Sequence, residues 1–163
     1  MSEYSRLEAG EAAPAFSLIN QKGKSVSLEA LAGQKVILYF YPAAATPACT
    51  MEAVDFNNAL PKFKKAGYKV FGLSPDAPAK LAKFHENQGL KFDLLSDPDQ
   101  SVHQAYGAFG EKSLYGRKYV GVIRSTVVLD ETGQVQLPLY NVKATGHVDM
   151  LLRLLGLAKP EAK

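Results

Sequence analysis

The sequence predicts a single α/β domain in which a central, mixed β-sheet is flanked by helices. Apolar runs of strand length alternate with segments of helical periodicity, which is the pattern of a sheet covered by helices. Near the carboxyl end, two short apolar runs are separated by a turn, which predicts an antiparallel hairpin and makes the sheet mixed. At 163 residues, the chain is long enough for one sizeable core and too short for two comfortable domains.

The strands are expected where short apolar runs end at turn-forming residues. They are predicted at residues 35–41, 68–74, 92–95, 125–129 and 134–137. The first run is apolar almost throughout and is followed by Pro42, as expected for a strand buried on both faces. The last two runs predict a hairpin with a loop of about four residues that includes Asp130 and Gly133.

Helices are expected between these strands, where caps mark their ends. Proline at the first helical position, threonine or aspartate before it and glycine after the last turn are the signals used. Pro61 lies inside the first predicted helix, where it removes a backbone hydrogen bond, so a kink or a break is expected there. The predicted helices run from Thr46–Pro47 to Gly67, from Asp76 or Ala77 before Pro78 to Gly89, from Asp97–Pro98 to about Ala105, and from Thr145 to Gly156.

We expect residues 1–156 to form the domain and residues 157–163 to be a flexible tail.

The composition and the first residues indicate neither a membrane protein nor a secreted one. The composition is 47% hydrophobic and 21% charged, and no stretch approaches the roughly 20 apolar residues of a membrane span. The first residues include an early acid and no apolar core, so no signal peptide is expected.

Basic residues and histidines do not indicate a nucleic-acid or metal site. The net charge is +3, and the densest basic cluster (Lys62, Lys64 and Lys65) is interpreted as a solvated helix face. The three histidines lack the spacing of metal ligands, so surface or capping roles are expected. They are His85, His103 and His147.

The single cysteine, Cys49, is the main clue to function. Because Thr46–Pro47 opens a helix, Cys49 falls in the first turn, beside unpaired backbone N–H groups and the positive end of the helix dipole. Such a position favours the reactive thiolate. A lone cysteine is more often a small buried side chain without chemistry, and at this point both interpretations stay open. One cysteine excludes an intrachain disulfide, in agreement with a reducing cytoplasm.

The periodicity after Cys49 predicts where its sulfur points. Apolar residues recur at the spacing of one helical face, and the predicted strand 35–41 ends just before this helix. Ligands of open α/β sheets bind beyond the carboxyl ends of strands, so the sulfur is expected in a pocket position. The face consists of Cys49, Ala53, Phe56, Leu60 and Phe63.

Pro42, Thr46 and Cys49 form the pattern P-x-x-x-T-x-x-C, and Arg124 stands far along the chain at the start of a later predicted strand. This constellation resembles the active site of peroxiredoxins. Segments over residues 10–16, 38–42, 94–99 and 115–119 are similar to the bacterioferritin-comigratory (PrxQ) branch of that family. The resemblance implies a thioredoxin-like fold and a thiol peroxidase that reduces hydrogen peroxide and small organic hydroperoxides without metal, haem or flavin.

The chemistry of peroxide reduction gives the matching residues their expected roles. The Cys49 thiolate is the nucleophile, and the Thr46 hydroxyl can both accept and donate a hydrogen bond between sulfur and peroxide. Arg124 keeps its charge, and its planar guanidinium can donate hydrogen bonds to the thiolate and to a peroxide oxygen at the same time. The backbone N–H groups of Ala48 and Cys49 can complete an oxyanion-type site.

Three further residues complete the predicted site. By resemblance, Pro42 belongs to the catalytic set and shields the sulfur from water, whereas Tyr41, directly before it, is expected to support the site. Glu52 either orients Arg124, as the matching position does in relatives, or only interacts with the helix dipole.

The chain departs from many PrxQ relatives because it has no resolving cysteine. The position five residues after Cys49 is Val54, and residues 83–85, where other relatives carry it, contain no cysteine. The expected cycle therefore uses one cysteine, from thiolate to sulfenic acid, with reduction by an external thiol: thioredoxin, glutaredoxin or a low-molecular-weight thiol. The helix that carries Cys49 is expected to stay folded on oxidation.

The residues around the motif also differ, because residues 43–45 and Ala48 replace a more polar stretch and a glycine, which predicts a less charged mouth. Two other functions stay open: a peroxide sensor or redox relay, and a thioredoxin-fold binding module with a vestigial thiol. A cytoplasmic monomer without nucleic-acid or membrane partners is expected.

Overall fold

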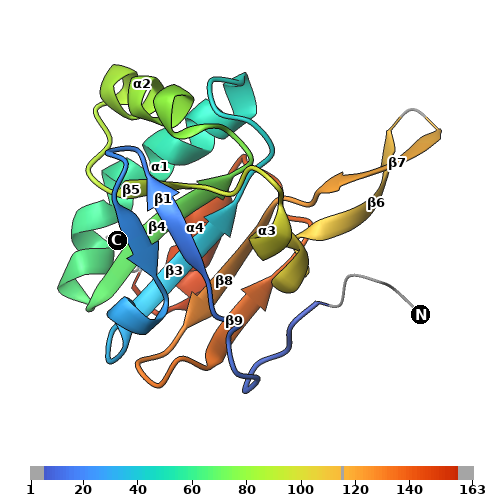
Figure 1. Cartoon of the computed structure of the whole chain (residues 1–163). Coiled ribbons are helices and arrows are strands. Elements are labelled where there is room, and N and C mark those ends of the chain that lie inside the picture. Colours follow the sequence, from blue (N-terminus) through green and yellow to red (C-terminus); the bar gives the residue numbers. More distant parts are fainter. Residues whose placement is uncertain (1–5, 115, 158–163) are drawn as a thin grey trace, which may run out of the picture.

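The computed structural model describes residues 6–114 and 116–157, in which a mixed seven-stranded β-sheet carries helices on both faces (Figure 1). The strand order is β2 (Ser25–Ser27), β1 (Ser17–Asn20), β5 (Asp93–Ser96), β4 (Tyr68–Ser74), β3 (Lys35–Phe40), β8 (Ser125–Leu129) and β9 (Val135–Leu139). Strands β3, β4 and β5 are parallel, whereas β1, β8 and β9 join their neighbours antiparallel. The predicted mixed sheet, with the late hairpin β8–β9, is confirmed.

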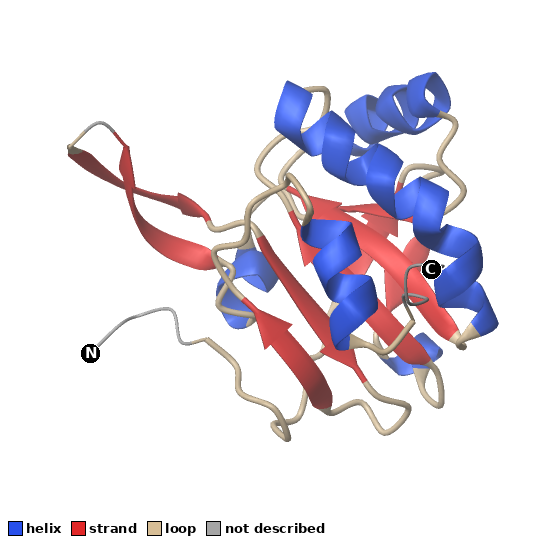
Figure 2. Cartoon of the chain, turned by 180° about the vertical axis from the view of Figure 1, so that it is seen from behind, coloured by secondary structure: helices blue, strands red, loops and turns tan. Residues whose placement is uncertain are grey.

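Two layers of helices bury the sheet. The helices are α1 (Pro47–Lys65), α2 (Pro78–Gln88), α3 (Ser101–Ala105), α4 (His147–Leu154) and a short 3-10 helix, η1 (Glu29–Leu31). Helices α1 and α4 lie on the face that Figure 2 turns toward the viewer, whereas α3 and η1 contribute to the core on the opposite face.

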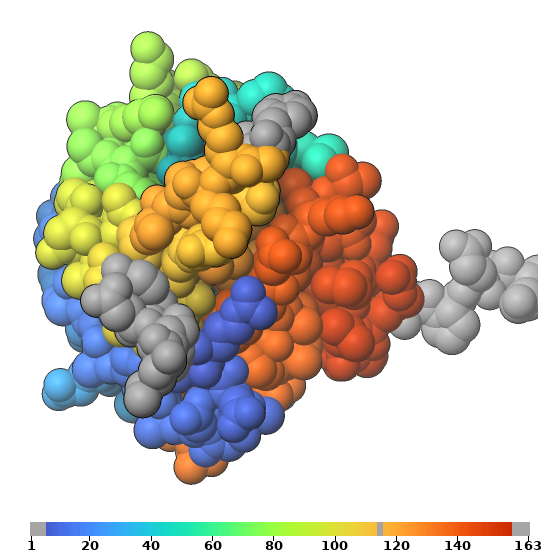
Figure 3. Space-filling view, turned by 90° about the vertical axis from the view of Figure 1, so that its right-hand side faces the viewer, coloured from blue at the N-terminus to red at the C-terminus, as the bar shows by residue number. Residues whose placement is uncertain are grey.

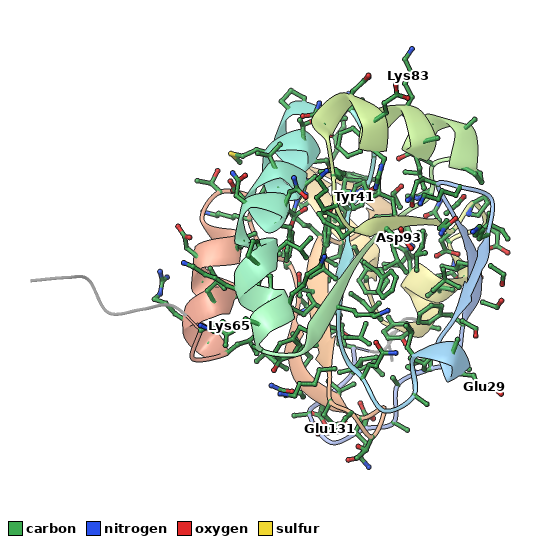
Figure 4. The ribbon with its side chains drawn as sticks, turned by 90° about the vertical axis from the view of Figure 1, so that its left-hand side faces the viewer. Glu29, Tyr41, Lys65, Lys83, Asp93 and Glu131 are labelled. Carbon is green, nitrogen blue, oxygen red and sulfur yellow. The ribbon has the colours of Figure 1, made fainter. Side chains whose placement is uncertain are left out.

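Successive side chains of β3 point alternately into the two cores, one on each face of the sheet. Ile37 and Tyr39 pack toward α1, whereas Leu38 and Phe40 pack into the core that includes α3. All of these side chains are fully buried, as predicted for a strand covered on both faces. In Figure 4, Tyr41 points into the interior at the carboxyl end of β3. This end of the sheet is where the chain turns into α1.

Helix α1 has the buried face that the spacing predicts, from Cys49 to Phe63. The expected break at Pro61 is wrong, because α1 continues to Lys65. The Pro61 side chain is exposed, so its missing N–H falls on the solvent side of the helix, where water can bind the freed carbonyl.

The start of α3 differs from the prediction. Instead of beginning beside Asp97–Pro98, α3 begins at Ser101, after a turn. The Asp97 carboxylate still caps it by accepting hydrogen bonds from the backbone N–H groups of Val102 (3.3 Å) and His103 (2.8 Å). The expected surface or capping role of His103 is wrong, since its ring is fully buried with Nδ1 2.6 Å from Asp97 Oδ2.

The start of α4 also differs. Its N-cap is Gly146, in the left-handed conformation, and not Thr145. His147 is buried rather than exposed. Of the tail expected at residues 157–163, Leu157 packs against the core, and residues 158–163 lie outside the described residues.

Strands β1 and β2, helix η1 and a two-stranded arm were not predicted. Strands β1 and β2 are four and three residues long and pair with each other, and β1 also pairs with β5. The arm is made of β6 (Phe109–Leu114) and β7 (Arg117–Val122), and it projects from the body in Figures 1 and 2. Figure 3 views the molecule from the side on which the arm stands. The segment that follows β7 leads directly to Arg124.

Candidate active site

The loop between β3 and α1 presents Cys49 in the first turn of the helix. Thr46 is the N-cap residue and Pro47 the first helical residue, as the sequence predicts. The Cys49 side chain is only 2% exposed and lies in the core on the α1 face of the sheet. The sulfur is therefore held in a nearly closed position at the end of β3.

Arg124 and Glu52 meet at this sulfur, although they lie 72 residues apart in the chain. Glu52 follows Cys49 by three residues, which places both on one side of α1. Arg124 directly precedes β8, and pairing of Ser125 with Phe40 of β3 brings it to the end of β3. Its Nη1 donates to Glu52 Oε1 at 2.5 Å, and its Nη2 donates to Cys49 Sγ at 3.3 Å. The Arg124 guanidinium thus donates hydrogen bonds to the carboxylate and to the sulfur at the same time.

Burial and the charges within this pair act in opposite directions on the pKa values of Glu52 and Arg124. Burial raises the pKa of Glu52 to about 7, although the nearby Arg124 lowers it. Within the described part of the chain, Glu52 Oε2 is buried without a hydrogen-bond partner. Burial opposes the charge of Arg124, but the Glu52 carboxylate and the Cys49 sulfur outweigh it and raise the pKa of the guanidinium. The sulfur therefore has a permanent cation beside it.

The Thr46 hydroxyl is oriented by the loop. It donates a hydrogen bond to the Ala43 carbonyl at 2.8 Å and makes no capping bond. In this orientation the hydroxyl proton is directed to Ala43 and the oxygen is left to accept a hydrogen bond; the expected contact of Thr46 with peroxide stays a prediction. Since its side chain does not cap the helix, Thr46 leaves the first-turn amides of Ala48 and Cys49 to other acceptors.

Tyr41 and Pro42 lie on opposite sides of the loop. Tyr41 is buried, its ring stacks on Tyr39 with centroids 5.4 Å apart, and burial raises the pKa of its phenol, which stays neutral. Pro42 is exposed to solvent. The structure thus places Tyr41 beneath the site and Pro42 at its surface.

Residues outside the predicted set of site residues line the floor of the site. Tyr39 stacks on Phe56 of α1, with ring centroids 4.3 Å apart, and Gly72 of β4 leaves room for its ring. His147 Nε2 lies 2.7 Å from Thr126 Oγ1 on β8. Burial lowers the pKa of His147 to about 4, and the positive charge of Arg124 adds to this effect. The alternation of Tyr39 and Tyr41 along the strand could have indicated this floor, whereas no local signal marks His147.

The site is built for thiol chemistry. It combines a sulfur at a helix start, a fixed cation at hydrogen-bond distance and an oriented hydroxyl, which suit attack by a thiolate on an electrophilic atom. Among the described residues, no group of three or more His, Cys, Asp or Glu side chains could hold a metal ion. Nor is any helix in the described ranges long and apolar enough to cross a membrane.

Comparison with known proteins gives matches along nearly the whole chain. The family described as AhpC/TSA matches residues 9–137. A Mycobacterium tuberculosis protein named as a peroxiredoxin is 54% identical over 157 residues, which are 96% of this chain and 100% of the relative. Peroxiredoxin Bcp of Escherichia coli is 42% identical over 149 residues, 91% of this chain and 96% of the relative.

Solved structures give the same assignment. The bacterioferritin comigratory protein of Xanthomonas campestris superimposes with a TM-score of 0.84 at 38% identity, over 91% of this chain and 98% of that one. Peroxidoxin BcpB of M. tuberculosis gives a TM-score of 0.81 at 30% identity, over 95% and 100% of the two chains. The similarity covers nearly the whole length of both chains in each case.

Proposed function

Since this chain belongs to the AhpC/TSA family and is a peroxiredoxin, a thiol-dependent peroxidase, we propose that it reduces peroxides by a cycle in which Cys49 is the only redox-active residue. The observation that carries this proposal is the Arg124 fork, which contacts the Cys49 sulfur at 3.3 Å while it is held by Glu52. The fixed cation stabilises the thiolate before attack and the developing oxyanion during it.

The first half of the cycle oxidises the enzyme. The Cys49 thiolate attacks one peroxide oxygen, the O–O bond breaks, and the second oxygen leaves as alkoxide or hydroxide and takes up a proton. The products are the sulfenic acid of Cys49 and one alcohol or water. The Thr46 hydroxyl oxygen accepts a hydrogen bond from the O–H of the bound peroxide. The backbone N–H groups of Ala48 and Cys49, together with Arg124, stabilise the negative charge that develops on the departing oxygen. Pro42 limits the access of water.

The second half of the cycle depends on thiols from outside the chain. Because Cys49 is the only cysteine, the sulfenic acid condenses with an external thiol, releasing water and leaving a mixed disulfide. A second external thiol then releases Cys49 and carries away the disulfide. Thioredoxin, glutaredoxin or a low-molecular-weight thiol can serve, and no step requires α1 to unwind.

The uncharged surface around Cys49 favours organic hydroperoxides as well as hydrogen peroxide as substrates. Pro42, Ala45, Pro47 and Ala48 are all exposed and none carries a charge. The X. campestris structure is described as giving insight into alkyl peroxide reduction by that protein, which supports the same substrate class here. We further propose that the chain works as a monomer in the cytoplasm.

Turnover with defined reductants tests this cycle. Peroxide consumption is measured with dithiothreitol, with a thioredoxin system and with a glutaredoxin system, for the wild-type chain and Cys49→Ser. We expect multiple turnovers with at least one reductant and none in the variant. If Cys49 is oxidised but no reductant supports turnover, the one-cysteine peroxidase cycle is wrong and the relay interpretation replaces it.

Far-ultraviolet circular dichroism of the reduced and oxidised forms tests whether α1 stays folded. The Val54→Cys variant is the matched control. Five residues of intact helix rise about 7.5 Å, which is too far for a disulfide. We expect no change in helix signal on oxidation of the wild-type chain, and a loss of signal only where the variant forms a disulfide. A loss in the wild-type chain would contradict the proposal.

A further inference from the structure

We propose that Asp76 is a positioning residue of the active site: it ties the loop between β3 and α1 in the conformation that aims the Thr46 hydroxyl. This inference rests on the proposed function, because the loop matters only if Cys49 reacts with peroxide. Asp76 lies in the connection between β4 and α2, 32 residues after the loop that it holds.

The Asp76 carboxylate binds the loop directly. Its Oδ2 accepts hydrogen bonds from the backbone N–H of Ala44 at 2.6 Å and from the Ser74 hydroxyl at 2.9 Å. Its Oδ1 pairs with Lys80 at 3.1 Å. The Asp76 side chain is 11% exposed, so its bond to Ala44 is largely shielded from water. A charged acceptor in such a place holds a backbone amide more firmly than a neutral one.

The loop needs such a tie because its backbone is strained. Ala45 has φ 68°, in the left-handed region that residues with a Cβ rarely adopt. The residue on one side of it, Ala44, is bound by Asp76. The residue on the other side, Thr46, bonds back to the Ala43 carbonyl at 2.8 Å. The strained residue is therefore held between two hydrogen bonds.

Release of the first bond would disturb the second. Without Asp76, Ala45 can relax to a negative φ, which rotates the adjoining peptides and displaces the Ala43 carbonyl. The Thr46 hydroxyl then loses the acceptor that fixes its proton and its lone pairs. Asp76 contacts neither the sulfur nor the peroxide site, so its effect passes through the loop.

Two rates measured on the same protein test this role. One is the second-order rate of Cys49 oxidation by hydrogen peroxide, which depends on Thr46. The other is the rate of Cys49 alkylation by iodoacetamide, which needs the thiolate and access but no peroxide contact. For Asp76→Ala we expect oxidation to slow about tenfold or more, from the loss of a charge-assisted bond, with alkylation within about twofold of wild type. Lys80→Ala, at an exposed position on the other carboxylate oxygen, is the matched control and keeps both rates.

Rescue separates positioning from a general structural effect. Glycine tolerates φ 68° without strain, so Ala45→Gly in the Asp76→Ala background should restore much of the oxidation rate. Asp76→Asn keeps a neutral acceptor and should give an intermediate rate, which tests the proposal even where Asp76→Ala fails to fold. Wild-type oxidation in a folded Asp76→Ala or Asp76→Asn chain, or no rescue by Ala45→Gly, would overturn the inference. Failure of the wild-type chain to react with peroxide would instead refute the proposed function.

Discussion

Replacing Arg124 with lysine separates the geometry of the guanidinium from its charge. In the structure, Nη1 contacts Glu52 and Nη2 contacts Cys49, so two different nitrogens satisfy two acceptors at once. Lysine keeps the positive charge but has a single ammonium on a flexible stem, and the buried carboxylate of Glu52 competes for it. Loss of one hydrogen bond to a charged group costs about 1.5–3 kcal/mol. At about 1.4 kcal/mol per factor of ten, the oxidation of Cys49 should slow by about 10- to 150-fold.

The assay for Arg124→Lys must follow the thiol itself. The chain contains no tryptophan, so rapid quenching, alkylation and mass spectrometry are used in place of tryptophan fluorescence. Arg117→Lys, at an exposed position on the β6–β7 arm, is the matched control and should oxidise at the wild-type rate. An Arg124→Lys chain that is folded and reacts within twofold of wild type would refute the argument that the fork is required.

Three further variants test buried residues in and beneath the site by chemical denaturation. Burial raises the pKa of Glu52 from 4.5 to about 7, so between these pH values the folded chain keeps a proton that the unfolded chain has lost. The free energy of unfolding of wild type relative to Glu52→Gln should therefore fall by up to about 3 kcal/mol as the pH rises from 4.5 to about 7. Burial lowers the pKa of His147 from 6.5 to about 4, so wild-type stability relative to His147→Gln should rise between pH 4 and 6.5. Differences independent of pH would contradict either assignment. In Gly72→Ala, the new Cβ would lie 2.8 Å from the buried Tyr39 ring, and a loss of about 1–3 kcal/mol is expected. An unchanged unfolding midpoint would show that the ring can move.

Local patterns were sufficient for the central strands and for the start and buried face of α1, but not for its continuation through Pro61. The run of apolar residues in β3 and the spacing from Cys49 to Phe63 report burial on one or both faces, and burial is what fixes these elements. The strands β1 and β2 could not be predicted in this way, because they are only four and three residues long, and the pairing of β1 with β5 joins segments distant in the chain. The β6–β7 arm is largely exposed, so it carries little apolar periodicity.

The residues of the site also differ in whether a local sequence signal marks them. The place of Cys49 in the first turn follows from the Thr46–Pro47 start, which is a local signal. Nothing near Arg124 in the sequence distinguishes it from a surface residue, and only the resemblance to a family pointed to it. The buried pairs His103–Asp97 and His147–Thr126 were missed because the residue types alone do not reveal that tertiary packing supplies a partner.

Trapping the oxidised thiol tests the central claim most directly. Reduced protein is mixed with one equivalent of hydrogen peroxide, quenched within seconds with a sulfenic-acid trap, and examined by mass spectrometry. If Cys49 is the peroxidatic residue, the trap labels it rapidly and stoichiometrically. A Cys49 thiol that is still free after minutes would mean that the site is silent and would contradict the account.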